Sequence, residues 1–212
     1  MGRWSPIERT LRAQFGPLLV GVDEVGRGPL AGPVVACAVV MPPEQRAIAG
    51  VDDSKRLDAA TRETLALRIR ERALVVALGA ASVREVDRLN IHHATVLAMR
   101  RALARVPRGL GRAPDHVLVD GNPLRTLGVL HTAVVKGDAK CYAIACASIV
   151  AKVTRDRLMT ALAARHAAYG WERNRGYGTA EHQRAIAGHG LTRHHRRSFC
   201  ESVQGDLLDG AG

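Results

Sequence analysis

Residues 18–40 read LLVGVDEVGRGPLAGPVVACAVV, and this stretch decides which fold the chain can form. Residues 18–22 and 34–41 are continuous apolar runs rich in β-branched side chains, a pattern typical of buried strands. Between them, Gly26-Arg27-Gly28 predicts a glycine-rich turn. Two acidic residues, Asp23 and Glu24, interrupt the apolar segment. The stretch therefore predicts two buried strands that carry acidic side chains close to a turn.

The rest of the chain alternates between helical and strand patterns. The patterns predict helices at 58–72 after an N-cap at Asp58, at 91–106 after a cap at Asn90, at 142–168 and at 180–187. Further strands are predicted at 74–80, 116–119 and 129–135. This order predicts an α/β fold, with a mixed sheet followed by a helical C-terminal part.

The composition favours a single basic domain that binds a polyanion. A chain of 212 residues with 47% hydrophobic residues fits one domain with a real core. The formal net charge is +11, from 31 Lys and Arg against 20 Asp and Glu. Nucleic acid is the commonest partner of a domain this basic. Only four of the basic residues are Lys, so a compositional preference for Arg is an alternative explanation of the charge.

The cysteines and the N-terminal residues indicate the compartment. The four cysteines form no Cys-x-x-Cys pair and lie mostly in apolar surroundings, so we expect reduced thiols. Residues 1–16 lack the apolar region of a signal peptide, and no apolar run is long enough to span a bilayer. We therefore expect a cytoplasmic protein with no membrane partner.

Four carboxylates lie in or directly after predicted strands. They are Asp23, Glu24, Asp120 after the strand at 116–119, and Asp138 after the strand at 129–135. Burying carboxylates among aliphatic residues is costly unless a positive partner neutralises them. Oxygen ligands suit Mg²⁺ or Mn²⁺, and two such ions can clamp the attacking water and the leaving oxygen of a phosphodiester. The four acids therefore form a candidate metal site.

A purely structural explanation competes with this hypothesis. Acidic residues near turns are usually caps or solvated loop residues. Successive strand residues also point to opposite faces, so Asp23 and Glu24 can reach one site only if the strand ends or bulges there. Sequence spacing does not show whether the four side chains converge, but four strand-end acids in a basic chain favour the metal site.

Three further motifs suit the backbone of a nucleic acid. Gly26-Arg27-Gly28 would allow close backbone approach, with Arg27 on a phosphate, but the triplet could also be a simple turn. Ser54 and Lys55 offer a hydroxyl and an ammonium, or are the polar start of a helix. Arg196 and Arg197, in the basic run 193–197, predict a phosphate-contacting surface, with a solvated tail as the alternative.

The few aromatic residues divide into two groups. Tyr177 lies between Gly176 and Gly178 in a polar loop, where an exposed ring can stack on a sugar or base. Tyr169 and Trp171 are expected to pack inside the helical C-terminal part.

Together, these residues resemble the type 2 ribonucleases H, the bacterial ribonuclease HII family. The first match is GVDEVGRGPLAGPVV at 21–35. Seven further blocks follow in order: DSK at 53–55, NIHHAT at 90–95, VDGN at 119–122, VKGD at 135–138, ASIVAKVTRD at 147–156, GYGT at 176–179 and HRRSF at 195–199. About fifteen residues at the start and a dozen at the end fall outside the match. Two departures from the family pattern are slight: Arg175 replaces a frequent Lys, and Cys146 an expected Ala.

The resemblance implies a ribonuclease H-like fold, with a mixed five-stranded sheet, flanking helices and a helical C-terminal extension. It implies one catalytic domain at 16–200, of which about 140–200 is a helical lobe, with peripheral termini at 1–15 and 201–212. It also implies that Asp23, Glu24, Asp120 and Asp138 are the catalytic and metal-binding residues. Gly26, Arg27 and Gly28 would then read the 2′-hydroxyl of a ribonucleotide, while Tyr177 stacks on the next sugar.

The implied activity is that of an endonuclease. It would hydrolyse the RNA strand of RNA–DNA hybrids and incise 5′ of single ribonucleotides in duplex DNA by two-metal catalysis, leaving 3′-hydroxyl and 5′-phosphate ends. The expected partner is nucleic acid, and the expected state is a monomer. Two alternatives stay open. A resolvase-like nuclease of the same fold would share the carboxylates but not the Gly-Arg-Gly and Gly-Tyr-Gly-Thr motifs. A non-catalytic binder of hybrid duplexes would be expected to have lost carboxylates.

Overall fold

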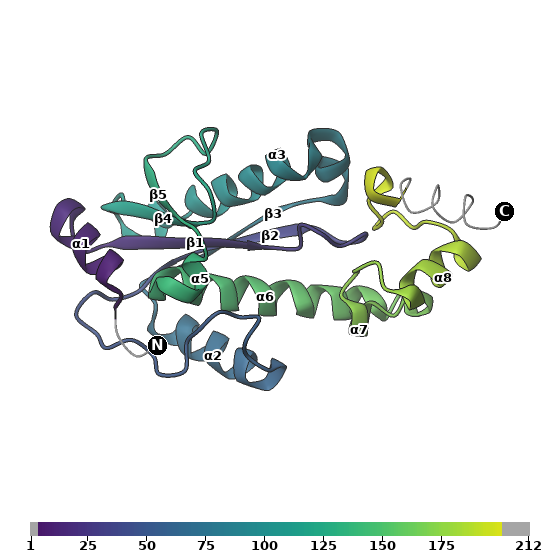
Figure 1. The fold of residues 1–212 in the computed structure, drawn as a ribbon, viewed down its shortest axis with the longest axis horizontal. Coiled ribbons are helices and arrows are strands. Elements are labelled where there is room, and N and C mark those ends of the chain that lie inside the picture. Colours follow the sequence, from purple (N-terminus) through teal and green to yellow (C-terminus); the bar gives the residue numbers. More distant parts are fainter. Residues whose placement is uncertain (1–3, 201–212) are drawn as a thin grey trace.

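The computed structural model describes residues 4–200 and contains one five-stranded sheet (Figure 1). Its strands are β1 (Leu19–Val25), β2 (Val34–Val40), β3 (Val75–Ala81), β4 (His116–Asp120) and β5 (His131–Val134), in the order β3-β2-β1-β4-β5. β1, β2 and β3 pair antiparallel, whereas β4 pairs parallel with both β1 and β5. The predicted mixed five-stranded sheet is confirmed.

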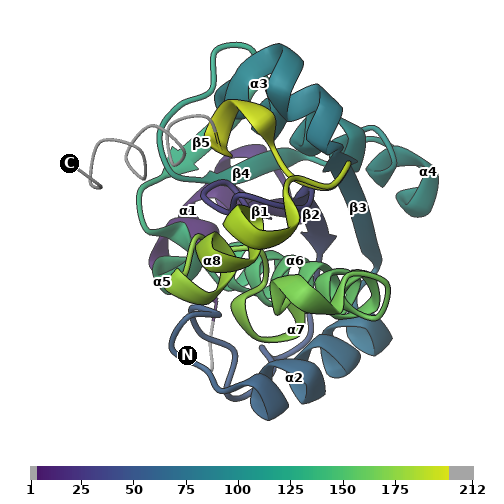
Figure 2. The ribbon, with the colours of Figure 1, turned by 90° about the vertical axis from the view of Figure 1, so that its right-hand side faces the viewer.

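Helices cover both faces of this sheet. The helices are α1 (Pro6–Phe15), α2 (Ala59–Arg72), α3 (Val83–Leu103), α4 (Val106–Leu110), α5 (Gly137–Lys140), α6 (Tyr142–Ala163), α7 (Trp171–Asn174) and α8 (Ala180–His189), with a 3₁₀ turn at Ala167–Tyr169. In Figures 1 and 2, α3 lies on one face, and α6, backed by α2, lies on the other. α7 and α8 lie at the end of the molecule where the chain turns from β1 into β2.

The core explains the apolar sequence of the strands. All seven residues of β2 are buried, because the α3 layer and the α6 layer cover its two faces, and its sequence is therefore continuously apolar. Tyr169 and Trp171 are buried in a separate cluster of the C-terminal part, as predicted. The four cysteines are free thiols and buried.

Helix α3 differs from the predicted helix at 91–106. Asn90 has φ 67° and ψ 168°, and its Oδ1 accepts a hydrogen bond from the backbone N–H of His93, so it caps the second half as expected. A first half begins at Val83, where Ser82 and Glu85 form a capping box. The helix predicted after Asn90 is therefore the second half of α3, and the first half, from Val83 to the kink, was not predicted. Helix α6 also ends at Ala163, before the predicted end at 168.

The N-terminal segment is joined to the core through Glu8. This α1 side chain is fully buried, and its carboxylate accepts hydrogen bonds from the backbone N–H groups of Tyr142 (3.0 Å) and Ala143 (2.8 Å). It therefore caps the N-terminus of α6, where a negative charge interacts favourably with the helix dipole. The described part of the expected peripheral segment 1–15 is thus packed against the domain, whereas 201–212 lies outside the described residues.

In residues 4–200, no helix has the length and hydrophobicity needed to cross a membrane.

Candidate active site

The strand register brings three of the predicted carboxylates together. Val22 of β1 pairs with Val119 of β4, and the next residue of each strand is Asp23 and Asp120. The carboxyl ends of parallel strands meet at one edge of a sheet, so these two acids are neighbours. The backbone N–H of Gly137 donates to Asp120 Oδ1 at 2.6 Å, which places Asp138 of α5 at the same edge.

Glu24 reaches this edge differently from the way predicted. β1 neither ends nor bulges at Asp23, because its regular pairing with β2 continues through Glu24↔Ala36 to Val25↔Val35. Asp23 and Glu24 therefore point to opposite faces of β1. The register with β4 stops at Val22, so this edge of β1 has no strand partner beyond that residue. Burial raises the pKa of Glu24, and repulsion from Asp120 adds a smaller contribution across this open edge.

Burial makes the negative charges of this cluster costly. Asp23 is 6% exposed, and burial, with repulsion from Glu24 and Asp120, raises the pKa of its carboxyl well above the ordinary value. Burial also raises the pKa of Glu24 and of Asp120.

Two basic residues compensate this charge only in part. Arg27 lies 3.3 Å from Glu24, and Lys55 lies 3.3 Å from Asp138. Within residues 4–200, neither Asp23 nor Asp120 has a salt bridge. The cluster therefore keeps an excess of negative charge that a divalent cation would neutralise.

The donor set fits a hard divalent cation. Four carboxylates supply only oxygen ligands, as Mg²⁺ and Mn²⁺ prefer. In the described part of the chain, no three His, Cys, Asp or Glu side chains are already arranged to hold an ion. The fit rests on the chemistry and charge of the donors.

The Asp-Ser-Lys motif contributes a lysine to the cluster but no exposed hydroxyl. The Lys55 side chain is 79% exposed, and its ammonium contacts Asp138. Ser54 is buried, and its hydroxyl lies 2.9 Å from that of Ser148 in α6. The prediction that Ser54 contacts substrate is therefore wrong for this structure, because its hydroxyl is buried and interacts with the hydroxyl of Ser148.

Ser148 is a site residue that the sequence reasoning missed. Its hydroxyl is also close enough to Asp23 to oppose the rise in the pKa of that carboxyl, which burial causes. The available signal was the spacing of Ser148, Lys152 and Arg155, polar residues at i, i+4 and i+7 in a largely buried helix.

The two glycine-flanked motifs lie side by side. Arg27 and Gly28 are exposed, and Tyr177 is 44% exposed. A Cβ added at Gly28 would lie 3.8 Å from Tyr177 Cε1. The tertiary structure therefore joins two loops that are far apart in the sequence into one exposed surface next to Glu24.

Arg196 does not lie on that surface. Its side chain is fully buried, and its guanidinium donates to the backbone carbonyls of Gly26, Arg27 and Gly32. The prediction that Arg196 contacts phosphate is wrong, because its guanidinium is fully buried and its hydrogen bonds go to backbone carbonyls. Arg197 is exposed.

Comparisons with known proteins identify the family. The model of the Ribonuclease HII family matches residues 20–202. Ribonuclease HII of Granulibacter bethesdensis is 51% identical over 93% of this chain and 90% of its own length, and that of Jannaschia sp. (strain CCS1) is 54% identical over 94% and 96%. Ribonuclease H2 from Pyrococcus horikoshii OT3 superimposes with a TM-score of 0.70 at 26% identity, covering 85% of this chain and 93% of that one. Bst-RNase HIII in complex with Mn²⁺ shares the fold, with a TM-score of 0.74 at 20% identity over 93% of this chain and 72% of that one. With its ribonuclease H-like sheet and the carboxylates of Asp23, Glu24, Asp120 and Asp138, the chain belongs to the ribonuclease HII family of endonucleases.

Proposed function

We propose that this protein hydrolyses the RNA strand of RNA–DNA hybrids and incises duplex DNA on the 5′ side of single embedded ribonucleotides. The products would carry 3′-hydroxyl and 5′-phosphate ends. The relatives named ribonuclease HII support the nuclease activity, and the basic net charge of +11 supports a nucleic-acid substrate. We further propose that the protein acts as a monomer in the cytoplasm.

Asp23, Glu24, Asp120 and Asp138 would hold two divalent ions, Mg²⁺ or Mn²⁺. When bound, such ions lower the pKa of a water molecule and stabilise the charge that develops on the leaving oxygen. The protein's own contribution is to gather the four carboxylates. The Gly137 N–H orients Asp120 through a hydrogen bond, and the Ser148 hydroxyl favours the charged form of Asp23.

The remaining residues would bind and orient the substrate. The Arg27 side chain is 52% exposed beside Glu24, so its guanidinium can reach a phosphate close to the carboxylates. Lys55 is exposed enough to contact a phosphate while it neutralises Asp138. Gly28 has no side chain, so a sugar bearing a 2′-hydroxyl can approach the backbone there.

One observation carries the proposal: the loop that begins two residues after Glu24 meets the Tyr177 ring at Gly28. A ribonucleotide bound at Gly28 would place its sugar beside an exposed ring and its phosphate toward the carboxylates. This arrangement supports recognition and cleavage at a single ribonucleotide. A resolvase would not require the recognition, and a passive binder would not require the cleavage.

The test is cleavage of labelled duplexes that contain zero, one or four consecutive ribonucleotides, with the product ends mapped. We expect Mg²⁺- or Mn²⁺-dependent cleavage of the last two on the 5′ side of a ribonucleotide, and none of the all-DNA duplex. EDTA and the Asp120→Asn variant are the negative controls. Tight binding without cleavage would favour the non-catalytic binder, and cleavage of DNA junctions without ribonucleotides would favour the resolvase-like nuclease.

A further inference from the structure

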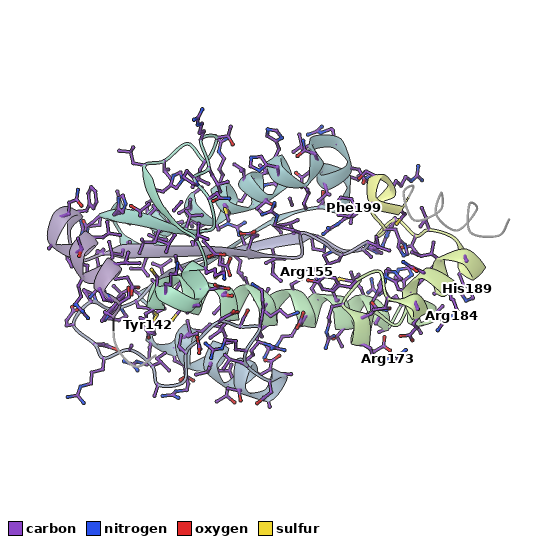
Figure 3. All side chains as sticks on the ribbon, viewed as in Figure 1. Tyr142, Arg155, Arg173, Arg184, His189 and Phe199 are labelled. Atoms are coloured by element: carbon purple, nitrogen blue, oxygen red, sulfur yellow. The ribbon has the colours of Figure 1, made fainter. Side chains whose placement is uncertain are left out.

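Two arginines of the C-terminal half are buried without an acidic partner. Arg155 of α6 and Arg196 after α8 are both fully buried, and neither has a salt bridge within residues 4–200. A buried charge is costly unless hydrogen bonds replace its water shell. A guanidinium has five N–H donors and no acceptor, so the identity of its acceptors shows what it holds. Figure 3 places Arg155 between the sheet and the C-terminal helices.

Both guanidiniums bind backbone carbonyls of the loop 26–33, and Arg155 also binds one of the loop that carries Tyr177. Arg155 donates to Pro33 O (3.0 Å), Ala31 O (2.9 Å) and Arg175 O (2.9 Å). Arg196 donates to Gly32 O (3.0 and 2.8 Å), Arg27 O (2.8 Å) and Gly26 O (2.5 Å). All but one of these acceptors lie in the loop 26–33, and the other directly precedes Gly176-Tyr177. Arg155 thus cross-links the two loops.

The backbone of these loops is shaped around the two side chains. Gly26 has φ +89°, and a Cβ there would lie 2.1 Å from Arg155 Nε. Arg175, a non-glycine residue, has φ +53°, a conformation that persists only where the surroundings impose it. Its carbonyl accepts from Arg155, which is one such constraint. Gly28, by contrast, faces only the Tyr177 ring.

Both guanidiniums keep their charge at neutral pH. Burial lowers the pKa of each, and with repulsion from Arg155 it lowers the pKa of Arg196 to about 9. Two positive charges therefore lie behind the exposed face of the loop. Salt screens buried charges much less than exposed ones.

We propose that Arg155 and Arg196 are positioning residues for ribonucleotide recognition. They turn the carbonyls of the loop 26–33 inward and fix this loop against Tyr177, so that Gly28 and the ring present one preformed surface. They also supply a positive potential behind that surface. This inference rests on the proposed function, because it assigns the surface to a ribonucleotide.

The test compares Arg155→Lys and Arg196→Lys with Glu8→Gln. Lysine keeps the charge but cannot reproduce the planar fork that reaches several carbonyls. Glu8 is an apt control because it is equally buried and holds the other end of α6, away from both loops. For a one-ribonucleotide duplex we expect each Lys variant to raise KM about ten-fold, the effect of losing one charge-assisted hydrogen bond, with kcat changed less than about three-fold. Glu8→Gln should lower Tm without changing KM.

Amide hydrogen exchange gives a readout that does not depend on activity. The Lys variants should lose protection in peptides covering 26–33 and 175–178, whereas Glu8→Gln should lose it at 141–145. Unchanged exchange in the two loops, or an equal loss of kcat and Tm in all three variants, would overturn the positioning role.

The same data separate this proposal from the proposed function. If the wild-type protein cuts no ribonucleotide-containing duplex, the proposed function fails, and the recognition role falls with it even if the exchange pattern shows that the arginines hold the loops. If the wild-type protein cuts normally and the Lys variants keep its KM, only the positioning role fails.

Discussion

Asp138 Oδ2 lies 3.3 Å from Lys55 Nζ, although 83 residues separate them in the sequence. The lysine side chain is mostly exposed, whereas the carboxylate is buried, so the pair marks where the cluster opens to solvent. Lys55 pairs with Asp138, and Arg27 pairs with Glu24. Asp23 and Asp120 therefore have no salt bridge in the described residues. The cluster therefore keeps negative charge that an added cation would neutralise.

The Asp23→Asn and Asp120→Asn variants should each lower the cleavage rate by several orders of magnitude. In the absence of divalent ions their Tm should equal or exceed that of the wild type, because each removes one member of a cluster of like charges. Rates on the one-ribonucleotide duplex and differential scanning fluorimetry measure the two effects. A variant that kept most of its activity, with an ordinary metal dependence, would lose its assigned role.

The Tyr177→Ala variant should lower cleavage at a lone ribonucleotide about ten- to a hundred-fold, since a stacking contact contributes about 1–3 kcal/mol. Tyr177→Phe should do less harm because it keeps the ring. The ring is 44% exposed, so neither change should lower Tm appreciably. Rates on duplexes with one and four ribonucleotides, measured with Tm, check this. A lower Tm with equal losses on both duplexes would instead make Tyr177 a packing residue.

The Arg197→Ala variant should weaken duplex binding and reduce the slope of log affinity against log salt by about one, as expected when one phosphate contact is lost. Arg197 is exposed, whereas its neighbour Arg196 is buried, so the single variant is the informative one. Arg68→Ala, an exposed arginine on α2, is the matched control. Fluorescence anisotropy across a salt series gives both slopes. An unchanged slope for Arg197→Ala would make it an ordinary solvated residue.

Stability should fall as the pH drops from about 6.5 towards 4, through a buried histidine pair. His182 Nε2 and His195 Nε2 lie 3.1 Å apart, and both side chains are buried. Burial lowers the pKa of both imidazoles, and with repulsion from His182, His166 and His194 that of His195 falls to about 4. An unfolded histidine titrates near 6.5, so in this window the unfolded chain binds more protons than the folded one.

The expected loss is up to about 1.4 kcal/mol per pH unit for each histidine, and it levels off below about pH 4 for His195. The raised carboxyl pKa values of the cluster act in the opposite direction, so the difference between variants is the useful quantity. Urea unfolding between pH 7.5 and 4.5 should show a smaller pH dependence for His195→Gln than for the wild type. The exposed His92→Gln should behave as the wild type. Equal pH dependence in all three would exclude the pair as the cause.

The sequence by itself determined the elements whose causes are local. Apolar β-branched runs predicted β1 and β2, and the caps Asp58 and Asn90 were readable because each side chain bonds a backbone N–H three residues further on. The four carboxylates stood out in the sequence as candidates because an acid in or beside an apolar strand is costly to bury. The sequence predicted them without showing which side chains they contact.

Only the tertiary structure decided which groups meet. The burial of Arg196, the Ser54–Ser148 contact and the capping of α6 by Glu8 each join segments far apart in the chain. The basic run 193–197 looks uniformly exposed in the sequence, yet His195 and Arg196 are buried while Arg193 and Arg197 are exposed. A buried arginine and an exposed one are the same residue type in the sequence. What separates them is whether carbonyls or water satisfy their donors, and that depends on long-range packing.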